Sequence, residues 1–164
     1  LLCIDNDQMM FVTVFYGILD LTSGRFQFVN AGHNPPVLIR HGGVPEFFPR
    51  SPSMVLAVME DATFPSEEVF VTPGDTLVFY TDGVTEATDP NGELFGDSRL
   101  LHSLGQIDQI TSVSEVIDRL LDDVHAFERG TPQADDITCV VVNYQGCGYT
   151  VEPTTVQLSQ ANHE

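Results

Sequence analysis

Two acidic clusters lie directly against strand-like apolar runs of the sequence. The first, Thr-Asp-Gly at 81–83, follows the apolar run 76–80; the second, Asp-Asp at 135–136, precedes the run 137–142. A carboxylate at the end of a core strand is held at the rim of a sheet, where its oxygens suit hard cations such as Mg²⁺ or Mn²⁺. The clusters therefore indicate a metal site, and phosphate hydrolysis is the reaction that this chemistry favours.

Each cluster also has a plain structural interpretation. An Asp-Gly pair after a strand is commonly a turn, because aspartate bonds its own backbone and glycine adopts positive φ without steric cost. Asp135 and Asp136 could in the same way cap or polarise the end of a strand. The hypothesis of a metal site therefore depends on the wider pattern of motifs and not on either pair alone.

Strands fill the first half of the chain in this interpretation. β-Branched and aromatic residues at 11–19, turn residues at 20–24 and alternating residues at 25–29 predict a β-hairpin. Turn signals and apolar runs predict further strands at 37–40, 44–48, 67–71, 76–80 and 137–144.

Helical patterns appear in the second half. The segment 97–104 predicts a short helix, and apolar residues at helical spacing predict a long one over 113–127. Ser112 and Glu115 match a capping box at its start, and Gly130 supplies a stop. Many strands, then helices, then one more strand predict an α+β layered domain and not alternating β-α-β units.

Composition limits the partners. The 164 residues have the length of one domain, and 24 acidic residues against six arginines and no lysine give a formal charge of −18. Such a chain lacks the basic face that nucleic acid or an anionic membrane surface requires. Most of the acidity is interpreted as solvated surface; a salt-adapted source or a basic partner is the alternative.

The cysteines and the hydropathy pattern indicate the cellular compartment of the protein. Cys3, Cys139 and Cys147 show no C-x-x-C spacing, which favours a reducing environment. No apolar run approaches the ~18 residues of a membrane span, and the amino end lacks the pattern of a signal peptide. We therefore expect a cytoplasmic protein, with residues 1–145 folded and residues 146–164 a tail or linker.

Three motifs occur together in one order. They are Phe-Val-Asn-Ala-Gly-His-Asn-Pro-Pro at 28–36, the segment 78–87 with Asn-Gly-Glu-Leu-Phe-Gly at 91–96, and Ala-Asp-Asp-Ile-Thr-Cys-Val-Val-Val at 134–142. This set resembles the PPM-type metal-dependent Ser/Thr protein phosphatases, most closely their stage II sporulation protein E branch, which includes regulators of sigma factors. The resemblance covers roughly residues 9 to 144 of this sequence.

The resemblance implies a fold and a mechanism. The fold is an α-β-β-α sandwich, in which helices flank two antiparallel sheets, with two Mn²⁺ or Mg²⁺ ions between the sheet ends. Asp82 and Asp135 match the ligands of one metal, while Gly83 and Asp136 are expected outside its direct ligands. Water activated by the metals would attack phosphorus in line with the leaving Ser or Thr oxygen, so no protein nucleophile is required.

His33 and Glu86 are further candidates. Histidine ordinarily titrates near neutral pH, which suits His33 as a general acid toward the leaving oxygen; a hydrogen bond that fixes its Gly-His-Asn-Pro-Pro loop is the alternative. Glu86, four residues after Asp82, could accept from a water on the metal or be a solvated surface carboxylate. The segment 89–93 departs from the EF-hand spacing and is interpreted as a turn, so we exclude calcium there.

The family's amino-terminal third has no match in residues 1–10. That third supplies the Asp that bridges the two metals and a further ligand. The chain is therefore expected to be the carboxyl-terminal portion of a larger phosphatase domain, with weak or partial metal occupancy and negligible hydrolysis on its own. Missing strands would leave sheet edges unpaired, which predicts self-association.

The predicted function is Mn- or Mg-dependent hydrolysis of phosphoserine or phosphothreonine on a regulatory protein, such as an anti-sigma factor antagonist. One alternative is a phosphatase-like module that binds a partner without turnover. Another is a generic acidic β-sandwich whose Asp pairs are only turns. The generic sandwich does not explain why three motifs occur together in order.

Overall fold

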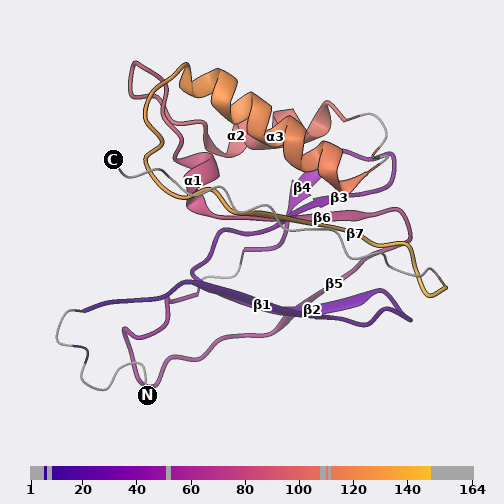
Figure 1. Cartoon of the computed structure of the whole chain (residues 1–164). Helices are drawn as coiled ribbons and strands as arrows, with labels where there is room; N and C mark the ends of the chain where they lie inside the picture. Colours follow the sequence, from indigo (N-terminus) through magenta and orange to yellow (C-terminus); the bar gives the residue numbers. More distant parts are fainter. Residues whose placement is uncertain (1–5, 7–8, 51–52, 108–109, 111, 149–164) are drawn as a thin grey trace.

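The computed structural model describes residues 6, 9–50, 53–107, 110 and 112–148. Two antiparallel sheets lie face to face, with helices against one of them (Figure 1). The three-stranded sheet has the order β1-β2-β5, with β1 at Val14–Leu19, β2 at Arg25–Ala31 and β5 at Glu67–Phe70. The four-stranded sheet has the order β4-β3-β6-β7, with β3 at Val37–Ile39, β4 at Pro45–Phe47, β6 at Thr76–Tyr80 and β7 at Cys139–Asn143. The helices are α1 at Asp82–Thr85, α2 at Gly96–Gly105 and α3 at Val113–Glu128.

The predicted β-hairpin is confirmed as the pair β1 and β2. Its turn is closed by Asp20, whose Oδ1 accepts hydrogen bonds from the backbone N–H groups of Thr22 (2.8 Å) and Ser23 (3.2 Å). The first strand begins at residue 14 and not at 11, because Val12 instead exchanges two backbone hydrogen bonds with Leu56. Tertiary pairing with a distant segment thus shortens a strand that local propensity alone would extend.

An aromatic core fills the space between the two sheets. Alternation along β2 points Phe26 and Phe28 inward, and both are buried. Their rings and those of three neighbours stack or meet edge to face, with centroids 5.1 to 6.4 Å apart; the neighbours are Phe15, Phe48 and Phe79. This core fixes which strands of the two sheets oppose each other.

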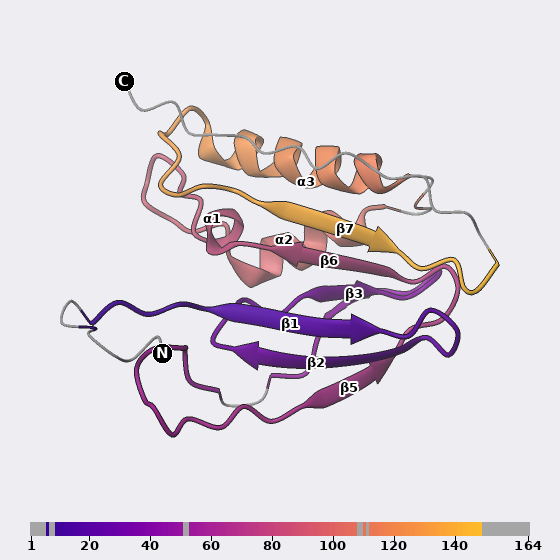
Figure 2. The ribbon, with the colours of Figure 1, turned by 60° about the horizontal axis from the view of Figure 1, so that its bottom comes forward.

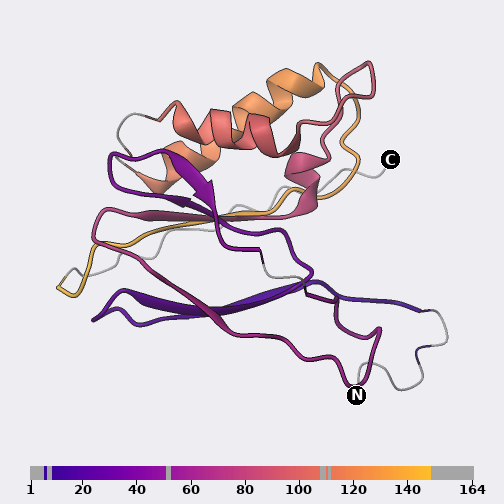
Figure 3. The ribbon, with the colours of Figure 1, turned by 180° about the vertical axis from the view of Figure 1, so that it is seen from behind.

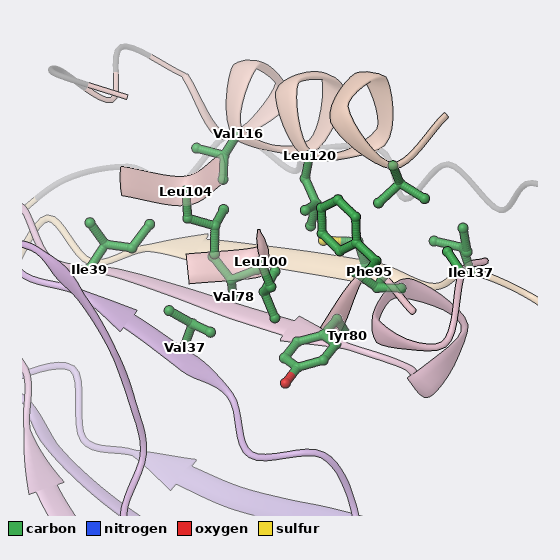
Figure 4. Packing of buried hydrophobic residues seen from close by; sticks show 14 residues of the cluster. Val37, Ile39, Val78, Tyr80, Phe95, Leu100, Leu104, Val116, Leu120 and Ile137 are labelled. Atoms are coloured by element: carbon green, nitrogen blue, oxygen red, sulfur yellow. The ribbon is translucent and has the colours of Figure 1, made fainter. Parts of the chain in front are cut away.

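A second core lies between the four-stranded sheet and the helices (Figure 4). The apolar stripe of α3 faces the sheet, with Val116, Leu120 and Val124 fully buried. Ser112 caps the helix as predicted, since its Oγ accepts from the N–H of Glu115 at 3.1 Å. The helix ends at Glu128, and the residue that follows it, Arg129, adopts the left-handed conformation with φ of 51°, one position before the predicted stop Gly130.

The helices cover only one of the sheets in the described part of the chain. Seen from behind, α1, α2 and α3 all lie beyond the four-stranded sheet (Figure 3). Among the described residues no helix covers the outer face of β1-β2-β5, where Tyr16, Ile18 and Phe70 are each more than half exposed. The two facing sheets and one helical layer of the expected sandwich are therefore confirmed. Self-association through the free sheet edges stays a prediction, which sedimentation equilibrium would test.

A buried carboxylate links the sheets at the start of β6. Asp75, 1% exposed, accepts hydrogen bonds from Arg40 Nη1 (2.9 Å), Thr72 N (2.8 Å), Thr72 Oγ1 (3.1 Å) and His41 N (3.0 Å). Arg40 also donates to the carbonyl of Phe70, in the other sheet, at 2.7 Å. Burial acts to raise the pKa of Asp75, but the hydrogen bonds from Thr72, His41 and Arg40 together outweigh it and hold that pKa below its ordinary value.

Crossing a bilayer requires a long apolar helix. The described residues form no helix with that combination of length and hydropathy.

Candidate metal centre

Three chain segments with predicted site residues meet at one end of the sandwich. Figure 2 shows β2 and β6 running toward this end, and β1 and β7 running away from it. Asp82 lies two residues after β6, Asp135 lies four residues before β7, and His33 lies two residues after β2. The fold thus brings the predicted site residues to a common rim.

Thr81 joins the two acidic segments. Its N–H donates to the carbonyl of Thr138 (3.1 Å), and its hydroxyl donates to the carbonyl of Asp136 (3.0 Å). The same hydroxyl accepts from the N–H of Thr138 at 2.9 Å. Thr81 precedes Asp82, and its partners Asp136 and Thr138 follow Asp135. These bonds therefore hold the two acidic segments together at the rim.

Gly83 permits a close approach between the segments. A Cβ at this position would lie 2.6 Å from the carbonyl oxygen of Asp136 and 3.1 Å from that of Asp135. Gly83 is not one of the positive-φ glycines, so the interpretation of Asp82-Gly83 as a positive-φ turn is wrong. The pair begins the single-turn helix α1, in which the N–H of Glu86 donates to the carbonyl of Asp82 at 2.8 Å.

We expect Gly83→Ala to separate the two acidic segments and lower the free energy of unfolding by roughly 1–3 kcal/mol, since the new methyl group meets backbone that cannot turn away. Urea unfolding measures the change. Gly105→Ala is the matched control, because its Cβ would approach nothing closer than Pro45 Cδ at 3.5 Å, an ordinary contact. Equal stability of Gly83→Ala and the wild type would refute the close approach.

The two carboxylates have a similar local geometry. Asp82 Oδ1 accepts from the N–H of Gly83 (3.1 Å), and Asp135 Oδ1 accepts from the N–H of Asp136 (2.7 Å). Within the described residues, neither Oδ2 atom has a hydrogen-bond partner, and both residues are exposed. Each aspartate therefore presents a free, hard oxygen, the donor type that Mn²⁺ and Mg²⁺ prefer.

The donor set is incomplete in the part of the chain that the structure describes. No group of three or more His, Cys, Asp or Glu side chains there could hold a metal ion. Asp82 and Asp135 therefore fit one side of a metal site, with two oxygen donors.

The remaining candidates lie around this pair. Glu86 is exposed and follows the last residue of α1, one turn after Asp82, which places both on the same side of the helix. Asp136 contributes its backbone carbonyl to Thr81, while its side chain is exposed. His33 is half-buried, with its ring nitrogen Nδ1 3.1 Å from Thr13 Oγ1.

Sequence reasoning missed Thr81, Thr13 and Asn30. The partners of the two threonines are set by the fold, since Thr81 bonds residues 55 and 57 positions away and Thr13 bonds a residue 20 positions away, whereas Asn30 bonds His33 three positions on. A hydroxyl residue directly before the Asp of the Thr-Asp-Gly motif was the one available signal.

Two curated proteins are similar to this chain in sequence. The chain is 32% identical over 137 residues to Protein IcfG from Synechocystis, and 25% identical over 136 residues to Phosphoserine phosphatase RsbU from Bacillus subtilis. These matches cover 84% and 83% of the chain. The chain spans only 21% of IcfG and 40% of RsbU.

Solved structures share the fold. The RsbU and RsbW domains of Rv1364c from Mycobacterium tuberculosis superpose with a TM-score of 0.65 at 29% identity, over 82% of this chain and 36% of that one. The catalytic domain of the serine/threonine protein phosphatase PstP, solved in complex with two manganese ions, gives a TM-score of 0.53 at 20% identity, over 80% of this chain and 57% of that one. The second likeness shows the fold alone.

The family comparison covers nearly all of the described chain. The family model described as stage II sporulation protein E (SpoIIE) matches residues 1–145, which include both acidic segments and the loop of His33. With the two facing sheets and the paired aspartates, this match establishes that the chain belongs to the SpoIIE family, whose relatives here include protein phosphatases.

Proposed function

We propose that the complete protein containing this chain hydrolyses phosphoserine or phosphothreonine on a regulatory protein, with Mn²⁺ or Mg²⁺ as cofactor. The observation that carries the proposal is the pair Asp82 and Asp135, held at one rim by Thr81 in a chain of the SpoIIE family. The relative RsbU is named a phosphoserine phosphatase, which supports the substrate class.

The chain's own residues would orient the reaction. Two bound Mn²⁺ or Mg²⁺ ions would supply positive charge for the phosphoryl oxygens and lower the pKa of a water. Asp82 and Asp135 would each offer the oxygen that is free of hydrogen bonds, while the backbone N–H groups that hold their other oxygens fix the direction of both carboxylates. The close approach of the two segments at Gly83 supports the proposal that both carboxylates serve one ion.

The charge of the chain makes the cations necessary for substrate binding. A phosphorylated side chain approaching a protein with a formal charge of −18 meets repulsion unless cations lie between them. We therefore expect a phosphorylated regulatory protein, of the kind of an anti-sigma factor antagonist, to bind only in the presence of the metal. A cytoplasmic location is part of the same proposal.

A binding module without turnover is the second candidate. The observation that favours it is the donor set, since no three His, Cys, Asp or Glu side chains of the described residues are grouped so as to hold a metal ion. Such a module would bind its phosphorylated partner and leave the phosphate in place.

Turnover of a phosphoserine peptide by the complete protein tests the proposal. We expect release of phosphate with Mn²⁺, none with EDTA, and negligible release from these 164 residues alone, because two carboxylates without further ligands hold the metal weakly. Turnover in EDTA would contradict metal dependence. Binding of the peptide by the complete protein with Mn²⁺ but without phosphate release would establish the binding module.

A further inference from the structure

Thr13 and Thr81 lie at the same end of the sandwich, next to strands of opposite sheets. The rings of Phe15 and Phe79 meet with centroids 5.7 Å apart, which places β1 and β6 opposite each other in the two sheets. Thr13 lies two residues before Phe15 and Thr81 two residues after Phe79, both toward the same end (Figure 2). Facing sheets are roughly 10 Å apart, so Thr13 lies across the gap from the acidic segments.

The loop of His33 is shaped by Asn30 and not by the imidazole. The side chain of Asn30 donates to the carbonyl of His33 (2.8 Å) and accepts from its N–H (2.7 Å). The turn between them passes through Gly32 with φ of +73°, which glycine adopts without strain. The structural role considered for the ring of His33 therefore belongs to the amide of Asn30.

The imidazole of His33 is left with one hydrogen bond in the described part of the chain, between Nδ1 and Thr13 Oγ1 at 3.1 Å. No described residue bonds Nε2. When one ring nitrogen is engaged, the hydrogen bond that it makes decides which nitrogen exchanges protons. Thr13 therefore controls the chemistry available at Nε2.

We propose that Thr13 is a positioning residue that accepts a hydrogen bond from Nδ1–H of His33, so that Nε2 delivers a proton to the leaving oxygen of a phosphorylated serine. This inference rests on the proposed function. As the bond from phosphorus to the leaving oxygen breaks, its electron pair goes to that oxygen, which takes the Nε2 proton. His33 changes from imidazolium to neutral imidazole, and Nδ1–H stays on Thr13.

Water supplies the oxygen that phosphorus gains and the proton that His33 loses. The oxygen of the attacking water forms the new bond to phosphorus, its proton is released to solvent, and solvent returns a proton to Nε2. The products are a free serine hydroxyl and inorganic phosphate.

Two substrates with different leaving groups distinguish proton delivery by His33 from a purely structural role. A serine alkoxide is strongly basic and requires a proton as it leaves, whereas p-nitrophenolate is a stable anion that does not. General acid catalysis contributes roughly 10²–10⁴-fold where it is needed. Loss of the acid should therefore slow a phosphoserine peptide and spare p-nitrophenyl phosphate.

The kinetic experiment uses the complete protein with Mn²⁺ and both substrates. We expect His33→Gln to lower kcat on the peptide by about 10²-fold and Thr13→Val by about tenfold, with p-nitrophenyl phosphate within about twofold of wild type. Thr13→Ser keeps the hydroxyl and should keep the activity. Thr22→Val, in the hairpin turn at the opposite end, is the control. Equal losses on both substrates, or no loss on the peptide, would overturn the proposal.

A second measurement does not depend on turnover. In ¹⁵N-histidine-labelled complete protein, at a pH where histidine is neutral, the ring nitrogen shifts of His33 should show the Nδ1–H tautomer, with His33→Gln used for assignment. Thr13→Val should convert it to the Nε2–H tautomer, and Thr13→Ser should not. A wild-type protein in the Nε2–H tautomer would overturn the proposal even if phosphatase activity is found. If phosphatase activity is absent but the tautomers behave as expected, the proposed function fails and the positioning by Thr13 stands.

Discussion

We expect Asp82→Asn to lower kcat of Mn²⁺-dependent hydrolysis by the complete protein at least about 10²-fold. Substitution of residues that only hydrogen-bond a metal's ligands already lowers activity by roughly 10–100-fold, and loss of a direct ligand should cost no less. The reason is charge: an amide oxygen replaces the free carboxylate oxygen that Asp82 presents at the rim. Phosphate release from a phosphoserine peptide, measured with saturating Mn²⁺, gives the value.

The substitution leaves the fold intact, which makes the result interpretable. Asparagine keeps an Oδ1 that accepts from the N–H of Gly83, so the urea midpoint should not change. Asp118→Asn removes one charge from the exposed side of α3 and is the control for net charge. Wild-type kcat in Asp82→Asn, with Asp118→Asn also unchanged, would remove Asp82 from the site.

Asp75→Asn has the largest expected effect on stability. The substitution puts an NH₂ group among donors from Arg40, Thr72 and His41, and leaves the positive charge of Arg40 without its buried partner. Breaking a buried ion pair costs about 3–5 kcal/mol; we expect about 3, because Arg40 is 40% exposed and can turn to water. Urea unfolding gives the free energy.

An exposed ion pair provides the comparison. Arg25 and Glu68 meet at 2.7 Å with 45% and 46% of their side chains exposed, so Glu68→Gln should cost less than about 1 kcal/mol. A similar loss in Asp75→Asn and Glu68→Gln would show that the buried network contributes no more than a surface pair.

The pKa of Asp75 also sets a pH dependence. Its folded pKa lies below the unfolded value, so the stabilisation is fully present above the unfolded value of about 3.9 and is lost as pH falls through the folded pKa. The free energy of unfolding should therefore fall less steeply below about pH 4 in Asp75→Asn than in the wild type.

The elements that the sequence predicts well are those with strong local patterns. The strand 76–80 and the long helix from Val113 match the structure, because alternation and a helical apolar stripe are local properties. The start of β1 differs because Val12 pairs with Leu56, 44 residues away. Helix α1 was missed, since four residues are too few to show a period.

The site was predictable as far as its motifs extend. Asp82 and Asp135 follow from two short motifs, and the structure places both at one rim. The role of Gly83 required the distance to Asp136, which local turn preferences do not contain. Asp75 proved to be a buried link between the sheets, which local patterns do not show, because its partner Arg40 is 35 positions away and also donates to Phe70 in the other sheet.

The central claim is that Asp82 and Asp135 hold the same metal ion, and Mn²⁺ binding to the complete protein tests it most directly. Titration calorimetry would compare the wild type, Asp82→Asn, Asp135→Asn and the double variant. If both aspartates bind one ion, each single variant should weaken that ion's affinity at least about tenfold, and the double variant should lose less than the sum of the two changes in free energy. Wild-type affinity in both single variants, or fully additive losses, would contradict the shared site.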